Sequence, residues 1–147
     1  MKTAFLLNPR AKKGTGIQSW YSLEPEIKTR FPYCKIIAPA DPYQLKEALS
    51  LLAQEHYERL IIVGGDGTVN RVLNILLNEF PVWAHRLLLG VLPMGTGNDL
   101  VRNLGFTGSM QKNLDLLQQG FCRKVDVGKV TYSLHSGLPA EAQGHIL

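Results

Sequence analysis

Residues 61–74 read IIVGGDGTVNRVLN, and this stretch decides the fold class. An aliphatic run ends in three glycines that surround one aspartate, and apolar residues then recur at helical spacing. The pattern predicts a buried strand, a glycine loop and a helix in direct succession. The loop N–H groups and the positive end of the helix dipole are suited to binding phosphate. Asp66 places a negative charge there, which a phosphate tolerates if a cation lies between them.

The composition is that of a soluble globular protein with the size of one ordinary domain. The chain has 147 residues, of which 45% are hydrophobic and 19% charged, enough for a buried core. Sixteen Lys and Arg residues against twelve Asp and Glu give a net charge of +4 and an isoelectric point near 9.2. This balance suits anionic partners such as nucleotides or acidic lipid surfaces. Nucleic acid is not predicted, because no basic stripe with interleaved aromatic residues supports it.

The expected location follows from targeting signals and cysteines. No apolar stretch approaches the roughly 20 residues of a transmembrane helix, and the apolar run before Asn8 ends too early for a signal peptide. Cys34 and Cys122 lack metal-ligand spacing and fall in expected strands, which favours buried, reduced thiols. The sequence therefore predicts a cytoplasmic protein, with peripheral binding at the inner membrane face as an extension of that prediction.

Strands and helices alternate along the chain. The expected strands are residues 2–8, 34–38, 59–63, 87–92 and 122–134. The expected helices are residues 17–31, 42–53, 69–77, 99–104 and 109–119. Residues 59–63 and 87–92 are apolar on consecutive positions, which is typical of strands buried on both faces of a parallel sheet. The predicted fold class is α/β: an open, mostly parallel sheet with helices on both faces.

Local signals predict how two of the helices begin or break. Asp41 is a good N-cap, Pro42 suits the first helical position, and Gln44 completes a capping box. Pro25 is expected to kink or split the helix that begins near Ile17.

Three glycine-bearing loops follow expected strands, at residues 8–16, 64–68 and 93–99. In an open α/β sheet the carboxyl ends of the strands bind the ligand, so the loops are expected to gather at one edge. None is a Walker A loop, and Gly64–Gly67 lacks the spacing of a Rossmann fingerprint. A tight turn would explain one such loop. Three of them, each after a strand, favour a phosphate site.

Three motifs in fixed order make the prediction more specific. NPRAKKGTG (8–16), GGDGTVNRVLN (64–74) and LGVLPMGTGNDLVRNLG (89–105) resemble the catalytic domain of the diacylglycerol kinase and sphingosine kinase family, and most closely its bacterial members. GGDGT alone is shared with NAD kinases, whereas Asn70, Asn74 and P-x-GTGND are typical of the lipid kinases. The resemblance predicts a nucleotide-binding domain over residues 1–130. Residues 131–147 are then the truncated start of a second domain or a frayed tail.

The resemblance implies an ATP-dependent kinase that phosphorylates a lipid hydroxyl such as that of diacylglycerol. The implied cofactors are ATP and Mg²⁺, and the implied partner is a lipid substrate at the membrane surface. A homodimer is left open. The residues implied to lie near the nucleotide are Asn8, Gly14, Gly16, Gly64, Gly65, Asp66, Gly67, Thr68, Val69, Asn70, Gly95, Thr96 and Asn98.

Asp66 is the predicted catalytic residue, and two roles for it stay open. It could join a network of metal and water with Asp99 and Asp126, because Mg²⁺ binds few carboxylates directly and keeps several waters. It could instead accept the proton of the attacking hydroxyl, as proposed for the equivalent aspartate of some relatives. Asp99 has the alternative of a helix N-terminal acid, and Asp126 that of a residue capping a turn at a strand end.

This sequence departs from the family pattern in two ways. Ala38 or Ala40 stands where the family has a threonine that contacts the nucleotide, a loss of about 1 kcal/mol, and Lys13 replaces a serine. Family members are also much longer, and their second, β-rich domain supplies the lipid pocket. Little lipid phosphorylation is therefore expected of this chain alone. A catalytically inactive nucleotide-binding remnant is the main alternative, and an NAD kinase is a weaker one.

Overall fold

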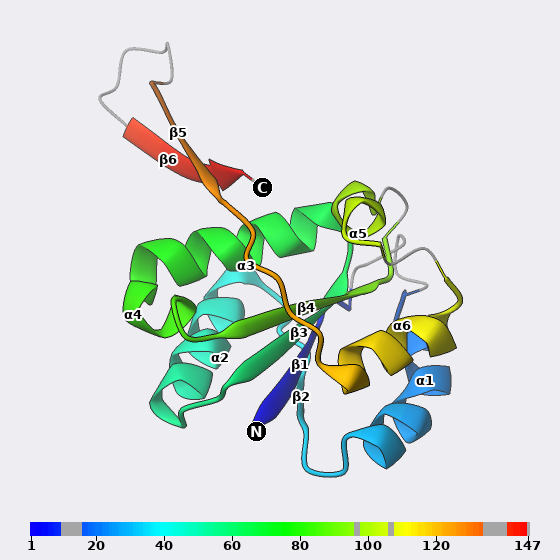
Figure 1. Cartoon of the computed structure of the whole chain (residues 1–147). Coiled ribbons are helices and arrows are strands. Elements are labelled where there is room, and N and C mark those ends of the chain that lie inside the picture. Colours follow the sequence, from blue (N-terminus) through cyan, green and yellow to red (C-terminus); the bar gives the residue numbers. More distant parts are fainter. Residues whose placement is uncertain (10–15, 96–97, 106–107, 134–140, 147) are drawn as a thin grey trace.

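Four parallel strands form the central sheet of the computed structural model, which describes residues 1–9, 16–95, 98–105, 108–133 and 141–146 (Figure 1). The strand order is β2-β1-β3-β4, and every neighbouring pair is parallel. The strands are β1 (Thr3–Leu7), β2 (Lys35–Ile37), β3 (Arg59–Gly64) and β4 (Leu88–Pro93). The predicted open parallel α/β sheet is confirmed.

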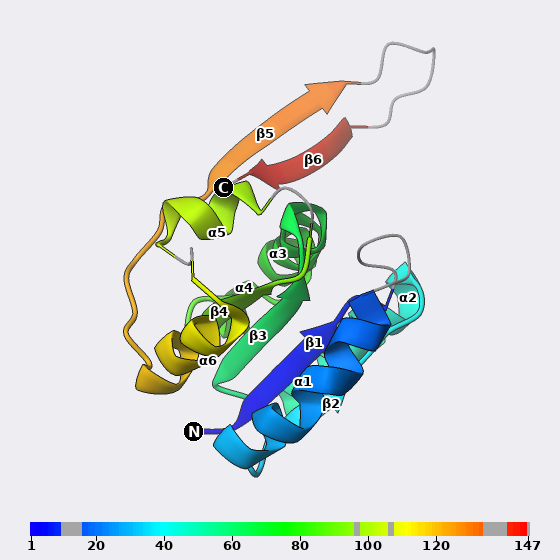
Figure 2. The same ribbon diagram turned by 90° about the vertical axis from the view of Figure 1, so that its right-hand side faces the viewer.

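Helices cover both faces of this sheet (Figures 1 and 2). One face carries α1 (Gly16–Arg30) and α6 (Met110–Gln119), which an ion pair between Arg30 and Asp115 joins. The other face carries α2 (Pro42–Gln54), α3 (Asp66–Glu79) and the short α4 (Pro81–Ala84). The short α5 (Asp99–Asn103) lies near the carboxyl end of β4.

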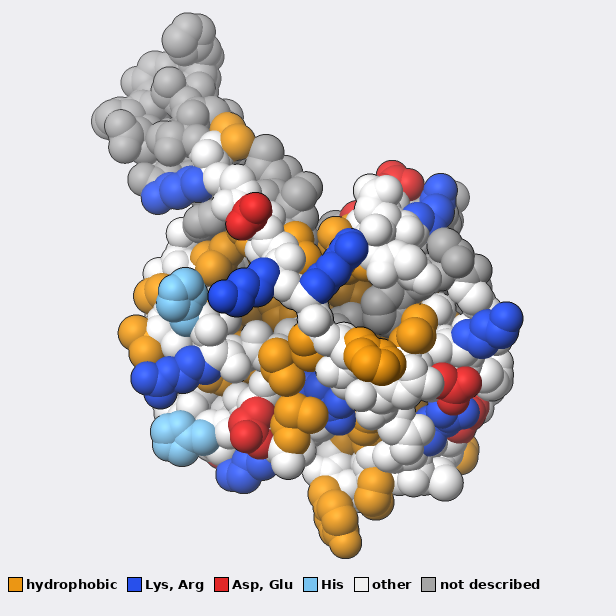
Figure 3. All heavy atoms as spheres, viewed as in Figure 1, with side chains coloured by type: hydrophobic (Ala, Val, Ile, Leu, Met, Phe, Trp, Pro, Cys, Tyr) orange, Lys and Arg blue, Asp and Glu red, His pale blue; other side chains and the backbone are white. Residues whose placement is uncertain are grey.

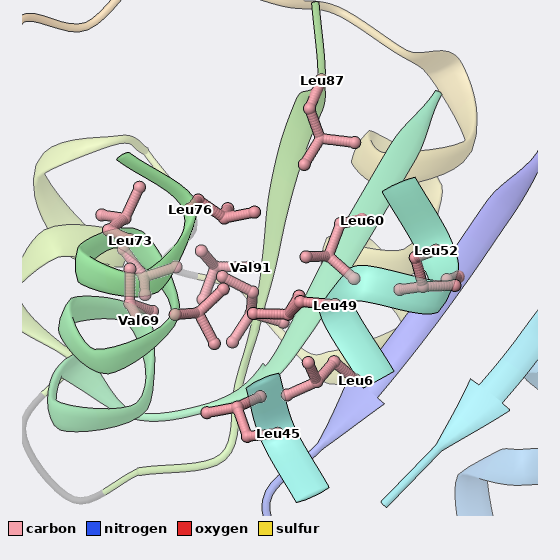
Figure 4. Packing of buried hydrophobic residues seen from close by; sticks show 14 residues of the cluster. Leu6, Leu45, Leu49, Leu52, Leu60, Val69, Leu73, Leu76, Leu87 and Val91 are labelled. Atoms are coloured by element: carbon pink, nitrogen blue, oxygen red, sulfur yellow. The ribbon is translucent and has the colours of Figure 1, made fainter. Parts of the chain in front are cut away.

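The core consists of two apolar clusters, one on each side of the sheet. Because side chains alternate along a strand, β3 contributes to both clusters. Leu60 and Ile62 pack with residues of α2 and α3 (Figure 4). Ile61 and Val63 pack with residues of α1 and α6. All four side chains have no exposed surface, so the prediction that this strand is buried on both faces is confirmed.

The expectation of a fully buried strand is wrong for the first half of β4. Leu88 is 38% exposed and Leu89 is 42% exposed, although Val91 and Leu92 are buried. The reason is the strand order, which places β4 at an edge with β3 as its one neighbour in the described sheet. Apolar side chains are visible on the face of the molecule that Figure 3 shows. Periodicity alone does not distinguish an edge strand from a central one.

The cap of α2 is confirmed. Its N-cap Asp41 accepts a hydrogen bond from the Gln44 backbone N–H at 2.9 Å. The Gln44 side chain accepts from the N–H of Ala40 at 2.9 Å, one residue before the position of a standard capping box.

The predicted split of α1 at Pro25 is not observed, since the helix runs without a break to Arg30. Proline removes the hydrogen bond to the carbonyl four residues earlier, here that of Tyr21. Tyr21 and Pro25 are both exposed. Water can therefore hydrate the Tyr21 carbonyl, and the helix continues.

The strand predicted at residues 122–134 begins later than expected. Residues 121–127 are irregular, and Val125 and Val127 are 46% and 36% exposed. Strand β5 (Gly128–Ser133) pairs antiparallel with β6 (Glu141–Ile146), and this hairpin stands apart from the four-stranded sheet in both views (Figures 1 and 2). Residue 130 lies within β5, and the division into residues 1–130 and 131–147 stays a prediction.

The cysteines differ from the expectation. Cys34 is half-buried and Cys122 is exposed, and neither lies in a strand. Within the described ranges, no helix is long and apolar enough to cross a membrane.

Candidate functional site

The predicted loops meet at the carboxyl ends of β1, β3 and β4. Two backbone hydrogen bonds extend the sheet pairing into them: the N–H of Asn8 donates to Val63 O at 3.1 Å, and that of Met94 donates to Gly64 O at 2.9 Å. Gly16 begins α1. Gly14 and Thr96, both predicted to lie near the nucleotide, fall outside the described residues. The described parts of the loops form one continuous edge.

Gly65 and Gly95 bring two of these loops into backbone contact. A Cβ on Gly95 would lie 2.5 Å from Gly65 Cα, and one on Gly65 would lie 2.9 Å from Gly95 Cα. Since both distances are to backbone atoms, no side-chain movement would relieve the overlap. The loops after β3 and β4 can approach this closely only because both positions are glycine.

Asn98 fixes the loop after β4 from within. Its backbone is left-handed, with φ at 56°, a conformation that asparagine tolerates better than most residues. Its Oδ1 accepts from Gly95 N–H at 3.1 Å, and its Nδ2 donates to Gly95 O at 2.9 Å. The side chain thus satisfies both backbone groups of the glycine that touches the neighbouring loop.

Asp66 joins the same two loops by hydrogen bonds. It begins α3, and its Oδ2 accepts from the N–H of Asp99 at 3.0 Å, while its Oδ1 accepts from Leu100 N–H at 3.3 Å. A carboxylate that accepts from backbone N–H groups at a helix start is stabilised by them and by the helix dipole. The negative charge that Asp66 adds to the glycine loop therefore lies at the N-terminus of α5.

The three predicted metal ligands are only partly brought together. The backbone of Asp99 bonds Asp66, and its exposed carboxylate lies 3.5 Å from Arg102 Nη1. Asp126 is exposed on the irregular segment after α6. In the part of the chain that the structure describes, no three His, Cys, Asp or Glu side chains are grouped as metal ligands. A shared site for Asp66, Asp99 and Asp126 stays a prediction.

The first turn of α3 carries the other predicted residues. Thr68 Oγ1 accepts a hydrogen bond from Asn8 Nδ2 at 2.8 Å. Val69 is 3% exposed and belongs to the core, so only its backbone can face a ligand. Asn70 faces solvent and accepts from Asn74 Nδ2 at 3.0 Å. A Cβ on Gly67 would meet no atom within 4 Å, so the space beside this turn is open.

The family model of the diacylglycerol kinase catalytic domain matches residues 2–130. The chain belongs to this family. It is 46% identical to a diacylglycerol kinase of Staphylococcus carnosus over 77 residues, a match that covers 52% of this chain and 24% of that protein. It is 39% identical to a diacylglycerol kinase of Staphylococcus aureus over 89 residues, a match that covers 60% of this chain and 27% of that protein.

The fold is likewise similar to a solved structure of this family. A crystal structure of a diacylglycerol kinase from Bacillus anthracis superposes with a TM-score of 0.71 at 25% identity, covering 88% of this chain and 43% of that one. The chain therefore spans less than half the length of these relatives.

The family motifs supply the predicted site residues, but the sequence does not show how these residues are connected. The bonds from Asp66 to α5 and from Asn8 to Thr68 join positions 33 or more residues apart. No local sequence pattern predicts such hydrogen bonds, because the partner of Asp66 is a backbone N–H, which every residue except proline has.

Proposed function

We propose that this chain is the ATP-Mg-binding part of a lipid kinase that transfers the γ-phosphate of ATP to a lipid hydroxyl such as that of diacylglycerol. Family membership supports this reaction class. The observation that carries the proposal is the assembly of the loops after β1, β3 and β4 at one edge. The Asn8–Thr68 bond, the Gly65–Gly95 contact and the bonds of Asp66 to α5 hold them together.

The start of α3 is the proposed phosphate site. This helix has 14 residues, begins directly after the glycines and opens onto unfilled space beside Gly67. The positive end of its dipole and the nearby backbone N–H groups favour an anion there. Phosphoryl transfer needs mainly positioning and charge neutralisation, which a rigid glycine-lined edge can provide.

Asp66 and Asp99 fit a Mg²⁺ ion that arrives with the nucleotide. Mg²⁺ usually takes one or two protein carboxylates together with phosphate oxygens and water. Each Asp66 oxygen accepts one described backbone bond and keeps further acceptor capacity. When bound, the ion would neutralise the charge of the phosphates. Asp126 is the third candidate ligand, and proton acceptance from the lipid hydroxyl by Asp66 is the alternative role.

Calorimetric titration with ATP in Mg²⁺ tests the site. We expect Asp66→Asn to weaken binding about tenfold or more, a change of roughly 1.4 kcal/mol, and the difference to shrink when Mg²⁺ is chelated. Asp115→Asn is the matched control, since it removes an exposed charge on α6 and is expected to leave ATP affinity unchanged. Equal binding by wild type and Asp66→Asn would contradict the site assignment.

Labelling with γ-phosphate-labelled ATP tests the reaction. Diacylglycerol in anionic vesicles and free NAD are the two acceptors. Transfer to diacylglycerol supports the lipid kinase, and transfer to NAD supports the weaker alternative. Little lipid phosphorylation is expected of this chain alone, so ATP binding without transfer to either acceptor does not separate the nucleotide-binding part of a lipid kinase from a non-catalytic remnant. Ala38 or Ala40 in place of the family threonine is the motive for the remnant. A homodimer and a peripheral membrane location stay predictions.

A further inference from the structure

A side-chain hydrogen bond joins Asn8, in the loop after β1, to Thr68 of α3. Asn8 Nδ2 donates to Thr68 Oγ1 at 2.8 Å, and both residues are half-buried. The Asn8 backbone is itself anchored, because its N–H donates to Val63 O at 3.1 Å. The carboxamide therefore extends from a fixed point at the end of the sheet to the first turn of the helix.

The position of the Thr68 hydroxyl is also fixed. Its backbone N–H donates to Gly65 O at 2.9 Å within the first turn of α3. Its side chain lies directly on Gly64, where a Cβ would come within 2.7 Å of Oγ1 and 2.9 Å of the Thr68 Cβ. The absence of a side chain at Gly64 thus leaves room for the Thr68 side chain.

The polarity of the bond determines where the hydroxyl proton points. An amide NH₂ group can only donate, whereas a hydroxyl has one proton and two acceptor lone pairs. The Thr68 oxygen must therefore accept from Asn8, and its own proton must point away from the amide nitrogen. Thr68 lies in the first turn of α3, whose start is the proposed phosphate site.

We propose that Asn8 is a positioning residue that makes the Thr68 hydroxyl a hydrogen-bond donor to a phosphate group of the bound nucleotide. The inference rests on the proposed nucleotide site and deepens it. Asn8 then acts on the nucleotide through Thr68. The family motif implies only that Asn8 lies near the nucleotide. A direct contact of Asn8 with the nucleotide would give a different result in a double-mutant cycle.

The cycle uses Asn8→Ala, Thr68→Val and the double variant, with calorimetric titration of ATP-Mg. Valine keeps the shape of threonine and lacks the hydroxyl. Each single variant is expected to lower affinity about fivefold, the effect of losing one neutral hydrogen bond. The double variant is expected to bind no more weakly than Thr68→Val, because in this proposal Asn8 acts on the nucleotide only through the Thr68 hydroxyl.

Two further variants separate orientation from packing. Thr68→Ser keeps a hydroxyl, so it is expected to bind ATP-Mg as wild type does. Adding Asn8→Ala to Thr68→Ser is then expected to lower affinity as much as Asn8→Ala does in wild type. Asn8→Asp offers only acceptors, so it draws the Thr68 proton toward itself and is expected to reduce affinity more than Asn8→Ala does. The added negative charge of Asn8→Asp also lowers ATP-Mg affinity when residue 68 is valine. The double variant Asn8→Asp, Thr68→Val therefore measures the effect of the charge without the hydroxyl. Thermal unfolding of each variant monitors the fold.

The outcomes distinguish this inference from the function on which it rests. If wild type fails to bind ATP-Mg, the proposed function is overturned, and this inference falls with it. If wild type binds and the losses from Asn8→Ala and Thr68→Val are additive, Asn8 contacts the nucleotide independently, and only this inference is overturned. A double variant equal to Thr68→Val supports it.

Discussion

The interior of the sheet and its loop edge are built on opposite rules. In the interior, apolar side chains fill space, and residues such as Leu49 and Ile61 have no exposed surface. At the edge, glycines remove side chains so that backbones can touch, as at Gly65 and Gly95. Interiors gain stability from buried area and close packing. Because the two regions depend on different residues, we expect stability and ligand binding to respond to different substitutions.

Two glycines, Gly90 within β4 and Gly95 just after it, show the same difference at short range. A Cβ on Gly90 would lie 2.7 Å from Leu117 Cδ2, the far end of a flexible side chain. A Cβ on Gly95 would lie 2.5 Å from a backbone atom, Gly65 Cα. The first overlap can be relieved by a rotation of Leu117, whereas the second requires a loop to move.

Leu49→Ala is expected to have the largest effect, and it acts on stability. Leu49 is fully buried between α2 and the sheet (Figure 4), and such truncations lower the free energy of unfolding by about 3 kcal/mol. Urea denaturation measures this change. ATP-Mg affinity of the folded protein is expected to stay within about twofold, because the loop edge is unchanged.

The matched control for this change is Leu51→Ala on the same helix, where the side chain is 45% exposed. Its effect is expected to stay near 0.5 kcal/mol. A large loss of affinity in folded Leu49→Ala would show that interior and edge are strongly coupled, contrary to the comparison.

Gly95→Ala is expected to act on binding instead. The new methyl group separates the loops after β3 and β4 and strains the Asn98 side chain, whose Oδ1 would lie 2.8 Å from it. We expect ATP-Mg affinity to fall at least about tenfold, with a smaller loss of stability than in Leu49→Ala. Gly90→Ala is the control and is expected to keep normal affinity, with a loss of stability of about 1–3 kcal/mol from the added methyl group. Equal losses of affinity in the two variants would contradict the importance of the glycine contact.

The two cysteines give the smallest test of the comparison. Cys34 packs against the cluster beneath α1, and burial raises the pKa of its thiol. Cys122 is exposed on the segment after α6. Because the thiolate is the reactive form, we expect a water-soluble thiol reagent to label Cys122 before Cys34. Mass spectrometry after brief labelling identifies the site, and labelling in urea should remove the difference. Preferential labelling of Cys34 in the folded protein would show that this part of the interior is open.

The sequence predicted those features that depend on local pattern. The apolar run at residues 60–63 identified a buried strand, and Asp41 with Pro42 and Gln44 identified the start of α2. The glycine motifs located the loop edge because parallel strands place their carboxyl ends together. Each of these inferences requires only a short stretch of chain and a general rule.

The features it missed depend on the arrangement of distant parts. Exposure of Leu88 and Leu89 follows from the place of β4 at the sheet edge, which a run of leucines does not encode. Continuity of α1 through Pro25 depends on which side of the helix faces water. The bonds of Asp66 to α5 depend on how closely two glycines allow the loops to approach.

The strand order also determines when the site can form during synthesis. β1 can pair with β2 as soon as that strand has emerged, whereas its pairing with β3 must wait for Arg59, the partner of Thr3, because the chain leaves the ribosome N-terminus first. Every pairing in this sheet joins distant segments, which makes folding slow relative to that of helical proteins. The bonds of Asp66 to Asp99 and Leu100 cannot form until β4 has also emerged. The nucleotide of the proposed function would therefore stabilise the finished fold and would not guide the pairing of the first strands.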